Sequence, residues 1–145
     1  MIDHDMHLTI GSLLFDGIDQ IDLTGPFEVL SRLPNATHRL YARSTEPVRD
    51  IQGLRLVPDG TLGEAPQLDI LHVPGGPGQE ALMEDAAVLD WLRQKAAGSK
   101  NVLSVCTGAL LLGATDCFAV DGRRRTGRPS ICCPCSARSR STGAS

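Results

Sequence analysis

Twelve residues decide the fold: Val102-Leu103-Ser104-Val105-Cys106-Thr107-Gly108-Ala109-Leu110-Leu111-Leu112-Gly113. The order of a short apolar run, a cysteine, small residues and a second apolar run predicts a strand, a sharp turn and a helix. It is the cysteine counterpart of the G-x-S-x-G nucleophile elbow, with Ser104 at the position of the leading glycine. Such a turn lifts the Cys106 side chain from the sheet and leaves its thiol at a helix N-terminus, which favours a thiolate. The alternative is a buried structural cysteine, because free cysteine packs as a small hydrophobe.

The rest of the first 115 residues alternates between expected strands and helices. Strands are expected at 8–15, 38–44, 68–73 and 102–105, a small hairpin at 48–58, and one helix of about five turns at 79–97. Another helix is expected from about Asp22, with Thr24 or Gly25 as its cap and Pro26 in its first turn. This alternation predicts an α/β fold with a parallel sheet and helices on both faces.

Three polar segments follow the ends of expected strands. They are residues 22–26 (DLTGP), residues 74–76 (PGG) and residues 106–108 (CTG). Ligand sites of open parallel sheets lie beyond the carboxyl ends of the strands. We therefore expect the three segments to converge on one site.

The residue types in these segments suit nucleophilic chemistry, although each also has a structural explanation. Gly75 and Gly76 form either a plain tight turn or a pair of backbone donors for a developing negative charge. Asp22 is either a helix N-terminal carboxylate or an acid–base group, its pKa raised by a nearby thiolate. Thr107 either starts a helix or touches the substrate. The histidines at 4, 7, 38 and 72 show no obvious partner, and His72 is expected in the core.

Composition excludes several classes of protein. The chain has 145 residues, 41% hydrophobic and 3% aromatic, and a net charge of −3, which argues against nucleic acid as a partner. The N-terminus has no basic region followed by an apolar run, and no stretch approaches membrane-spanning length. We therefore expect a single domain in the cytoplasm, where cysteines are more often chemical than structural.

The motifs also resemble a known family. Residues 22–26 (DLTGP), 73–76 (VPGG), 81–85 (ALMED) and 104–108 (SVCTG) are similar in order and spacing to the DJ-1/PfpI superfamily. Within it they resemble the isonitrile (isocyanide) hydratases, to which the first of these segments points, since other members have a glutamate in that region. The resemblance runs from about Leu8 to Ala114.

This resemblance implies a flavodoxin-like fold of the class I glutamine amidotransferase type, usually dimeric. It implies that Cys106 attacks the terminal carbon of an isocyanide and that water, aided by Asp22, then releases an N-substituted formamide. Thr107 would assist, and Gly75 and Gly76 would line the pocket. It implies no metal and no organic cofactor. The substrate would be a small molecule, with no nucleic acid or membrane as partner.

Composition changes sharply near residue 115. Residues 1–115 contain 19 leucines, one cysteine, eight basic and fifteen acidic residues, a net charge of −7. Residues 116–145 contain no leucine, four cysteines, six arginines and two aspartates, a net charge of +4. We therefore divide the chain into an N-terminal part of a DJ-1/PfpI-like domain (1–115) and an aberrant tail (116–145). This composition predicts disorder, and the sheet is then incomplete at its C-terminal end.

Three other interpretations of the tail were considered. The Cys132-Cys133-Pro134-Cys135 cluster does not match the C-x₂-C pairs of structural zinc modules, and the arginines lack the aromatics of a nucleic-acid-binding fold. A shifted reading frame explains more of the tail. If GC-rich codons for residues 116–145 are read from their third base, the translated sequence regains leucines, a Gly-Arg-Arg turn, a Thr-His pair and an apolar strand.

A sheet that stops after the elbow strand exposes an edge, so we expect the chain to be unstable or aggregation-prone and weakly active at best.

Two functions remain beside the hydratase. One is a cysteine glyoxalase, deglycase or stress protein of the same superfamily, against which Asp22 in the hydratase-type segment argues. The other is the ligand-sensing, amidotransferase-like domain of a transcription regulator, which would require a helix-turn-helix downstream. Oxidation of Cys106 also stays open as a redox role.

Overall fold

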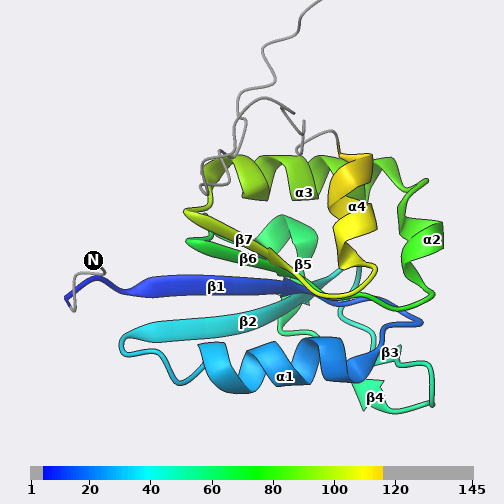
Figure 1. Cartoon of the computed structure of the whole chain (residues 1–145), viewed down its shortest axis with the longest axis horizontal. Helices are drawn as coiled ribbons and strands as arrows, with labels where there is room; N and C mark the ends of the chain where they lie inside the picture. Colours follow the sequence, from blue (N-terminus) through cyan, green and yellow to red (C-terminus); the bar gives the residue numbers. More distant parts are fainter. Residues whose placement is uncertain (1–4, 116–145) are drawn as a thin grey trace, which may run out of the picture.

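The computed structural model describes residues 5–115 and contains a five-stranded parallel sheet in the order β5-β2-β1-β6-β7 (Figure 1). The strands are β1 (Leu8–Leu13), β2 (Ala36–Ala42), β5 (Gly60–Thr61), β6 (Ile70–Val73) and β7 (Asn101–Ser104). The chain passes from β1 to β2 on one side and then returns to β6 and β7 on the other. The order therefore reverses beside β1, and such a reversal opens a crevice at the carboxyl ends of the strands.

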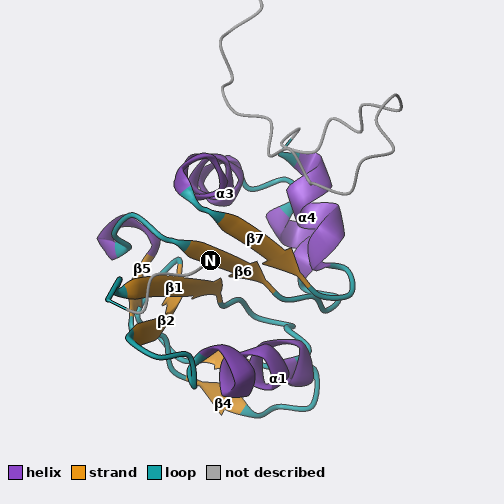
Figure 2. Cartoon of the chain, turned by 60° about the vertical axis from the view of Figure 1, so that its left-hand side comes forward, coloured by secondary structure: helices purple, strands orange, loops and turns teal. Residues whose placement is uncertain are grey.

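Helices cover both faces of the sheet, as the sequence predicts. Helix α1 (Gln20–Leu30) lies on one face, whereas α3 (Ala86–Gly98) and α4 (Gly108–Ala114) lie on the other (Figures 1 and 2). The short helix α2 (Gln79–Leu82) follows β6. Strands β3 (Val48–Arg49) and β4 (Arg55–Leu56) form the predicted antiparallel hairpin.

The core gathers around the two central strands. All four residues of β6 are buried, and so are five of the six residues of β1. The largest fully buried apolar side chains are Ile10, Leu13, Leu14, Ile18, Leu23, Leu68, Leu71, Val73, Leu92, Leu111 and Leu112. Burial of this apolar surface from both faces is the main stabilising contribution that holds the helices on the sheet.

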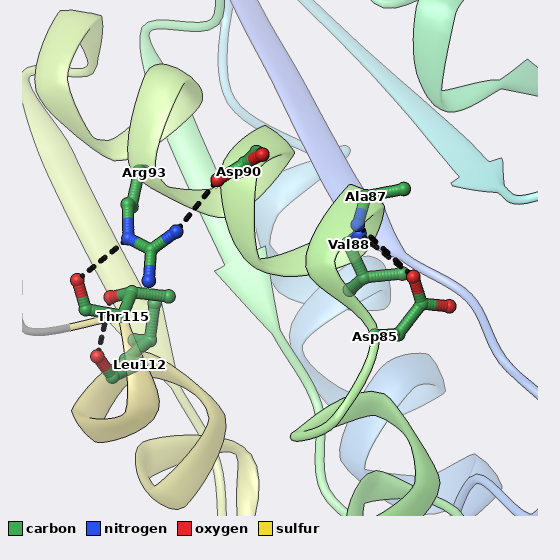
Figure 3. Close-up of polar contacts among 7 residues, drawn as sticks. All are labelled: Asp85, Ala87, Val88, Asp90, Arg93, Leu112 and Thr115. Carbon is green, nitrogen blue, oxygen red and sulfur yellow. Dashed lines mark hydrogen bonds and ion pairs between the residues drawn. The ribbon is translucent and has the colours of Figure 1, made fainter.

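The single helix expected at 79–97 was wrong, because Asp85 divides it into α2 and α3. The Asp85 side chain accepts hydrogen bonds from the backbone N–H groups of Ala87 and Val88, at 3.1 and 3.4 Å from its Oδ1 (Figure 3). Its own backbone is extended (φ −92°, ψ 100°), as is usual for an N-cap. The aspartate supplies the acceptors that the first turn of α3 needs, so a new helix begins there.

The start of α1 was also misplaced. The helix begins at Gln20 rather than Asp22, its N-cap is Asp19, and Pro26 lies inside the helix instead of in its first turn. Neither Thr24 nor Gly25 caps it. The position of Pro26 has a specific consequence, because proline has no N–H to donate to the carbonyl four residues earlier, that of Asp22.

Helix α4 is tied to α3 at its far end. Arg93 Nε donates to the backbone carbonyl of Thr115 at 3.1 Å, while Arg93 Nη1 pairs with Asp90 Oδ1 at 2.7 Å (Figure 3). The Thr115 hydroxyl donates back to the carbonyl of Leu112 at 2.5 Å. The bonds of Arg93 and of the Thr115 hydroxyl thus satisfy the carbonyls of Thr115 and Leu112 at the C-terminal end of α4.

Strand β7 is the edge of the sheet within residues 5–115. Leu103 of β7 and Leu110 of α4 are among the exposed large hydrophobic residues there. The expected instability stays a prediction. The division at residue 115 and the proposed zinc, disorder and frame-shift interpretations of 116–145 lie outside the described residues.

No helix in the part of the chain that the structure describes is both long enough and apolar enough to cross a membrane.

Candidate active site

Cys106 occupies the predicted sharp turn between β7 and α4. Its φ of +53° lies in the left-handed region, which non-glycine residues rarely adopt. Such local strain persists only where the surrounding structure imposes it, and it is typical of nucleophile elbows. The side chain is exposed and the thiol is free. The alternative of a buried structural cysteine is therefore wrong.

The three polar segments do converge, and they meet at Gly75. A Cβ on Gly75 would lie 2.7 Å from the backbone nitrogen of Thr107, 2.8 Å from Thr107 Oγ1 and 3.0 Å from Asp22 Oδ2. Only a residue without a side chain allows the α1 loop, the β6 loop and the elbow to approach this closely. Asp22 and the residue that follows Cys106 thus share one small volume.

Hydrogen bonds between backbones hold the same loops together. The N–H of Asp19 donates to the carbonyl of Gly75 at 3.0 Å, and the N–H of Gly78 donates to the carbonyl of Gly17 at 3.0 Å. The N–H of Val105 donates to the carbonyl of Val73 at 3.1 Å. These bonds join the chain segments that follow β1, β6 and β7 at the carboxyl ends of the strands.

The backbone donors differ from those expected. The N–H of Gly76 donates to Thr107 Oγ1 at 2.9 Å, so it is occupied and does not point a free donor at a substrate. The amide of Gly75 faces the Asp22 carboxyl. Among the described residues, the N–H groups of Cys106 and Thr107 are the ones at the elbow that find no acceptor. Sequence reasoning missed this pair of donors, although the elbow motif itself signals it.

Thr107 begins α4 but does not cap it with its side chain. Its hydroxyl instead tethers the elbow to the β6 loop through Gly76. The expected contact of Thr107 with a substrate stays a prediction.

The carboxyl of Asp22 has the properties of an acid. Burial, and next the charge of Asp19, raise the pKa of Asp22, while the Gly75 amide acts in the opposite direction. The cause is thus not the neighbouring thiolate that the sequence suggested. Its Oδ2 is buried and has no hydrogen-bond partner within residues 5–115. An unpartnered buried oxygen is unfavourable as an anion and is better accommodated as a protonated carboxyl or against a water molecule.

Two histidines form a polar cluster that the sequence analysis did not anticipate. Ser12 Oγ lies 2.6 Å from His38 Nε2 and 2.8 Å from His72 Nδ1, on three neighbouring strands. Burial is the main cause that lowers the pKa of each histidine to about 4. His72 is in the core, as expected, but the statement that the histidines lack partners was wrong. Polar residues within otherwise apolar strands were the available signal. His7 also has a partner, with its Nε2 2.9 Å from Thr37 Oγ1.

Two cavities of the described part of the chain lie away from the elbow. One, of about 430 Å³, is lined by His7, Thr9, Thr37, Arg39, Tyr41, Asp59, Gly60, Glu64 and Pro66. The other, of about 200 Å³, lies beside Phe15, Ala42 and Leu82. Within residues 5–115 no three histidine, cysteine or acidic side chains are grouped so that they could hold a metal ion.

The site thus combines the strained turn at Cys106 with the carboxyl of Asp22, whose pKa is raised. Both belong to a fold whose parallel sheet reverses its strand order beside β1. Residues 9–138 match the DJ-1/PfpI family. The chain belongs to the DJ-1/PfpI family. The matched range passes Ala114, so the resemblance extends further along the chain than the motifs indicated.

Individual DJ-1/PfpI relatives are similar over much of the chain. Isonitrile hydratase from Pseudomonas putida is 46% identical over 121 residues, covering 83% of this chain and 52% of that protein. The glutathione-independent glyoxalase DJR-1.2 of Caenorhabditis elegans is 36% identical over 76 residues, covering 50% of this chain and 41% of that protein. This chain therefore spans about half the length of these relatives.

A solved structure from the same family agrees with the fold. The crystal structure of a ThiJ/PfpI family protein from Pseudomonas syringae superimposes with a TM-score of 0.74 at 36% identity. The match covers 76% of this chain and 46% of that one. The parallel, flavodoxin-like architecture expected from the sequence is thus confirmed.

Proposed function

We propose that this chain carries the catalytic half of an isonitrile hydratase, an enzyme that adds water to an isocyanide to form an N-substituted formamide. The observation that carries the proposal is the convergence of the Cys106 elbow, Thr107 and the buried Asp22 Oδ2 at Gly75. The similarity to the isonitrile hydratase of Pseudomonas putida supports this reaction class.

Cys106 is the nucleophile of the first step. Its Sγ, as the thiolate, forms a bond to the terminal carbon of R–N≡C, and that carbon takes a proton to give the thioimidate R–N=CH–S–Cys106. We assign this proton to Asp22, whose carboxyl lies beside the elbow and whose pKa is raised by burial and by the charge of Asp19.

Water completes the reaction in the second step. The Asp22 carboxylate accepts a proton from water as the water oxygen adds to the thioimidate carbon, and Asp22 passes this proton to the nitrogen. The C–S bond of the resulting R–NH–CH(OH)–S–Cys106 then breaks while its hydroxyl proton returns to Asp22, which releases R–NH–CHO and restores the thiolate and the protonated carboxyl. The net change is the addition of one water molecule, and no oxidant, metal or organic cofactor enters the balance.

The free N–H groups of Cys106 and Thr107 suit the negative charge that develops during these steps. Within residues 5–115 these two N–H groups have no acceptor, so no bond to this part of the chain has to break before they interact with an intermediate. This assignment replaces the N–H of Gly76, which Thr107 occupies. Gly75 and Gly76 then act by allowing the close approach and by lining the site.

The test is direct. The protein is incubated with a small alkyl isocyanide, and the formamide proton is followed by NMR for the wild type and for Cys106→Ala. We expect formamide from the wild type and a rate at least a thousand-fold lower from Cys106→Ala. Formation of the product at the wild-type rate by Cys106→Ala would contradict the proposal.

A second candidate is a cofactor-independent glyoxalase, which the similarity to the Caenorhabditis elegans protein favours. A thiolate beside a carboxyl can also add to the aldehyde carbon of a 2-oxoaldehyde. Conversion of methylglyoxal without any conversion of isocyanide would select this function.

We further propose that the protein acts in the cytoplasm as a homodimer on a small molecule, and that residues 116–145 arise from a shifted reading frame. Sequencing the coding DNA past codon 110 tests the last point.

A further inference from the structure

Helix α1 carries a defect beside the site. Asp22 lies in its first turn and Pro26 lies four residues later, inside the helix. Since proline has no N–H, the backbone carbonyl of Asp22 loses the donor that an α-helix would normally supply. A carbonyl left unbonded next to the core is costly, and it would allow the turn that holds the Asp22 carboxyl to shift.

The imidazole of His72, on strand β6, can supply a hydrogen-bond donor. His72 of β6 is fully buried, its Nδ1 is bonded to Ser12, and its Nε2 forms no hydrogen bond of standard geometry within the described residues. The backbone carbonyl of Asp22 raises the pKa of His72, against the stronger lowering by burial and by His38. His38 also packs against Phe27 of α1, with ring centroids 4.6 Å apart, so the whole cluster lies beneath this helix.

The hydrogen-bonding capacity of Ser12 limits the tautomers. Ser12 Oγ has a single proton and contacts two ring nitrogens, so it can donate to only one of the two histidines. If His72 donated to Ser12 through Nδ1, its bare Nε2 would face the Asp22 carbonyl, and two acceptors would repel each other. The favoured arrangement has His38 donating to Ser12, Ser12 donating to His72 Nδ1, and a proton on His72 Nε2.

We propose that His72 is a positioning residue for Asp22. Its Nε2–H replaces the missing helical donor at the Asp22 carbonyl and so holds the first turn of α1, with the Asp22 carboxyl against Gly75. Ser12 fixes the tautomer. The catalytic consequence rests on the proposed function, in which Asp22 moves the proton.

Two substitutions of His72 separate its two nitrogens. His72→Asn keeps a group near Nδ1 for Ser12 and removes the Nε2 donor, whereas His72→Gln keeps a donor near the Nε2 position. We expect His72→Asn to lower kcat about tenfold with KM unchanged and to shift the titration of the Asp22 carboxyl. We expect His72→Gln to restore both. His38→Gln is the matched control, because it changes the same cluster without facing Asp22 and should leave kcat within about twofold.

The deciding measurement does not depend on activity. The ¹⁵N shifts of the imidazoles in the wild-type protein report the tautomer, and the ¹³C shift of the Asp22 carboxyl reports its titration. A neutral His72 with its proton on Nε2 supports the proposal, even if isocyanides are not substrates. A proton on Nδ1 would overturn it. So would a folded His72→Asn protein whose Asp22 titration is unchanged.

Discussion

Thr107 Oγ1 accepts a hydrogen bond from the backbone N–H of Gly76 at 2.9 Å, across 31 residues of sequence. The bond joins the elbow to the loop after β6, the two segments that form the proposed site. A threonine hydroxyl with this partner sets the distance between the Cys106 elbow and the glycine pair. Its first role is thus to hold the site together.

Loss of this bond should therefore reduce turnover more than it reduces stability. Thr107→Val keeps the shape and leaves the Gly76 N–H unbonded, which we expect to lower kcat/KM about ten- to a hundred-fold, in line with a net hydrogen-bond cost of about 1–3 kcal/mol. Thr107→Ser keeps the hydroxyl and should stay within about threefold of the wild type. A larger loss in Thr107→Ser than in Thr107→Val would mean that the methyl group, not the hydroxyl, matters.

A side chain at Gly75 should disrupt the meeting of the three segments. In Gly75→Ala the new methyl would lie within 3.0 Å of Asp22 Oδ2 and of two Thr107 atoms, closer than carbon tolerates. We expect a loss of about 1–3 kcal/mol of unfolding free energy and of at least tenfold in activity. The control is Gly113→Ala, where nothing lies within 4 Å of the added carbon and helix propensity should give a small gain. Urea unfolding measures both variants.

Acid should destabilise the protein through the buried histidines. The folded-state pKa of His72 is about 4, below its ordinary value of 6.5, so the stability that its neutral form contributes is complete above pH 6.5 and is lost as the pH falls towards 4. The slope for this group is at most about 1.4 kcal/mol per pH unit. His38, whose pKa is also lowered to about 4, adds a slope of the same sign.

The raised pKa of Asp22 acts in the opposite direction, since protonation favours the folded state there. His72→Gln therefore isolates the histidine contribution. Between pH 6.5 and 4 its unfolding free energy should fall less steeply than that of the wild type. Parallel curves for the two proteins would show that His72 does not titrate as described.

The N-cap at Asp85 should be worth about 1 kcal/mol. Asp85→Ala removes the acceptor for Ala87 and Val88 and should lower the unfolding free energy by that amount, whereas Asp85→Asn keeps a capping oxygen. Asp85 also pairs with Arg43, so Asp85→Asn reports the exposed ion pair separately. If Asp85→Asn lost as much unfolding free energy as Asp85→Ala, the effect would belong to the ion pair with Arg43 and not to the cap.

The sequence predicts the elements of this fold better than it predicts the contacts between them. Apolar runs in the sequence predict buried strands such as β1 and β6. The strand–turn–helix pattern around Cys106 predicts its place in a sharp turn. The division of α2 from α3 was missed because apolar spacing continues across Asp85, whose capping role depends on its backbone conformation. Strand β5 has two residues and is defined only by its pairing with β2.

The site shows the same limit. Asp22, Gly75, Gly76, Cys106 and Thr107 were all identified from their places after strands. The sequence does not predict that the N–H of Gly76 is bonded to Thr107 Oγ1, because this hydrogen bond joins loops that are distant in sequence. The pair of Ser12 and His72 belongs to neighbouring strands in register, which only the sheet order brings together.

The central claim is that an isocyanide becomes covalently attached to Cys106 before water releases it. Rapid quenching and mass spectrometry of the wild-type protein with an alkyl isocyanide, before the steady state, should find one intact isocyanide added to the peptide that carries Cys106. The same treatment of Cys106→Ala should find none. Formamide production by the wild type with Cys106 unmodified at every quench time would contradict the account.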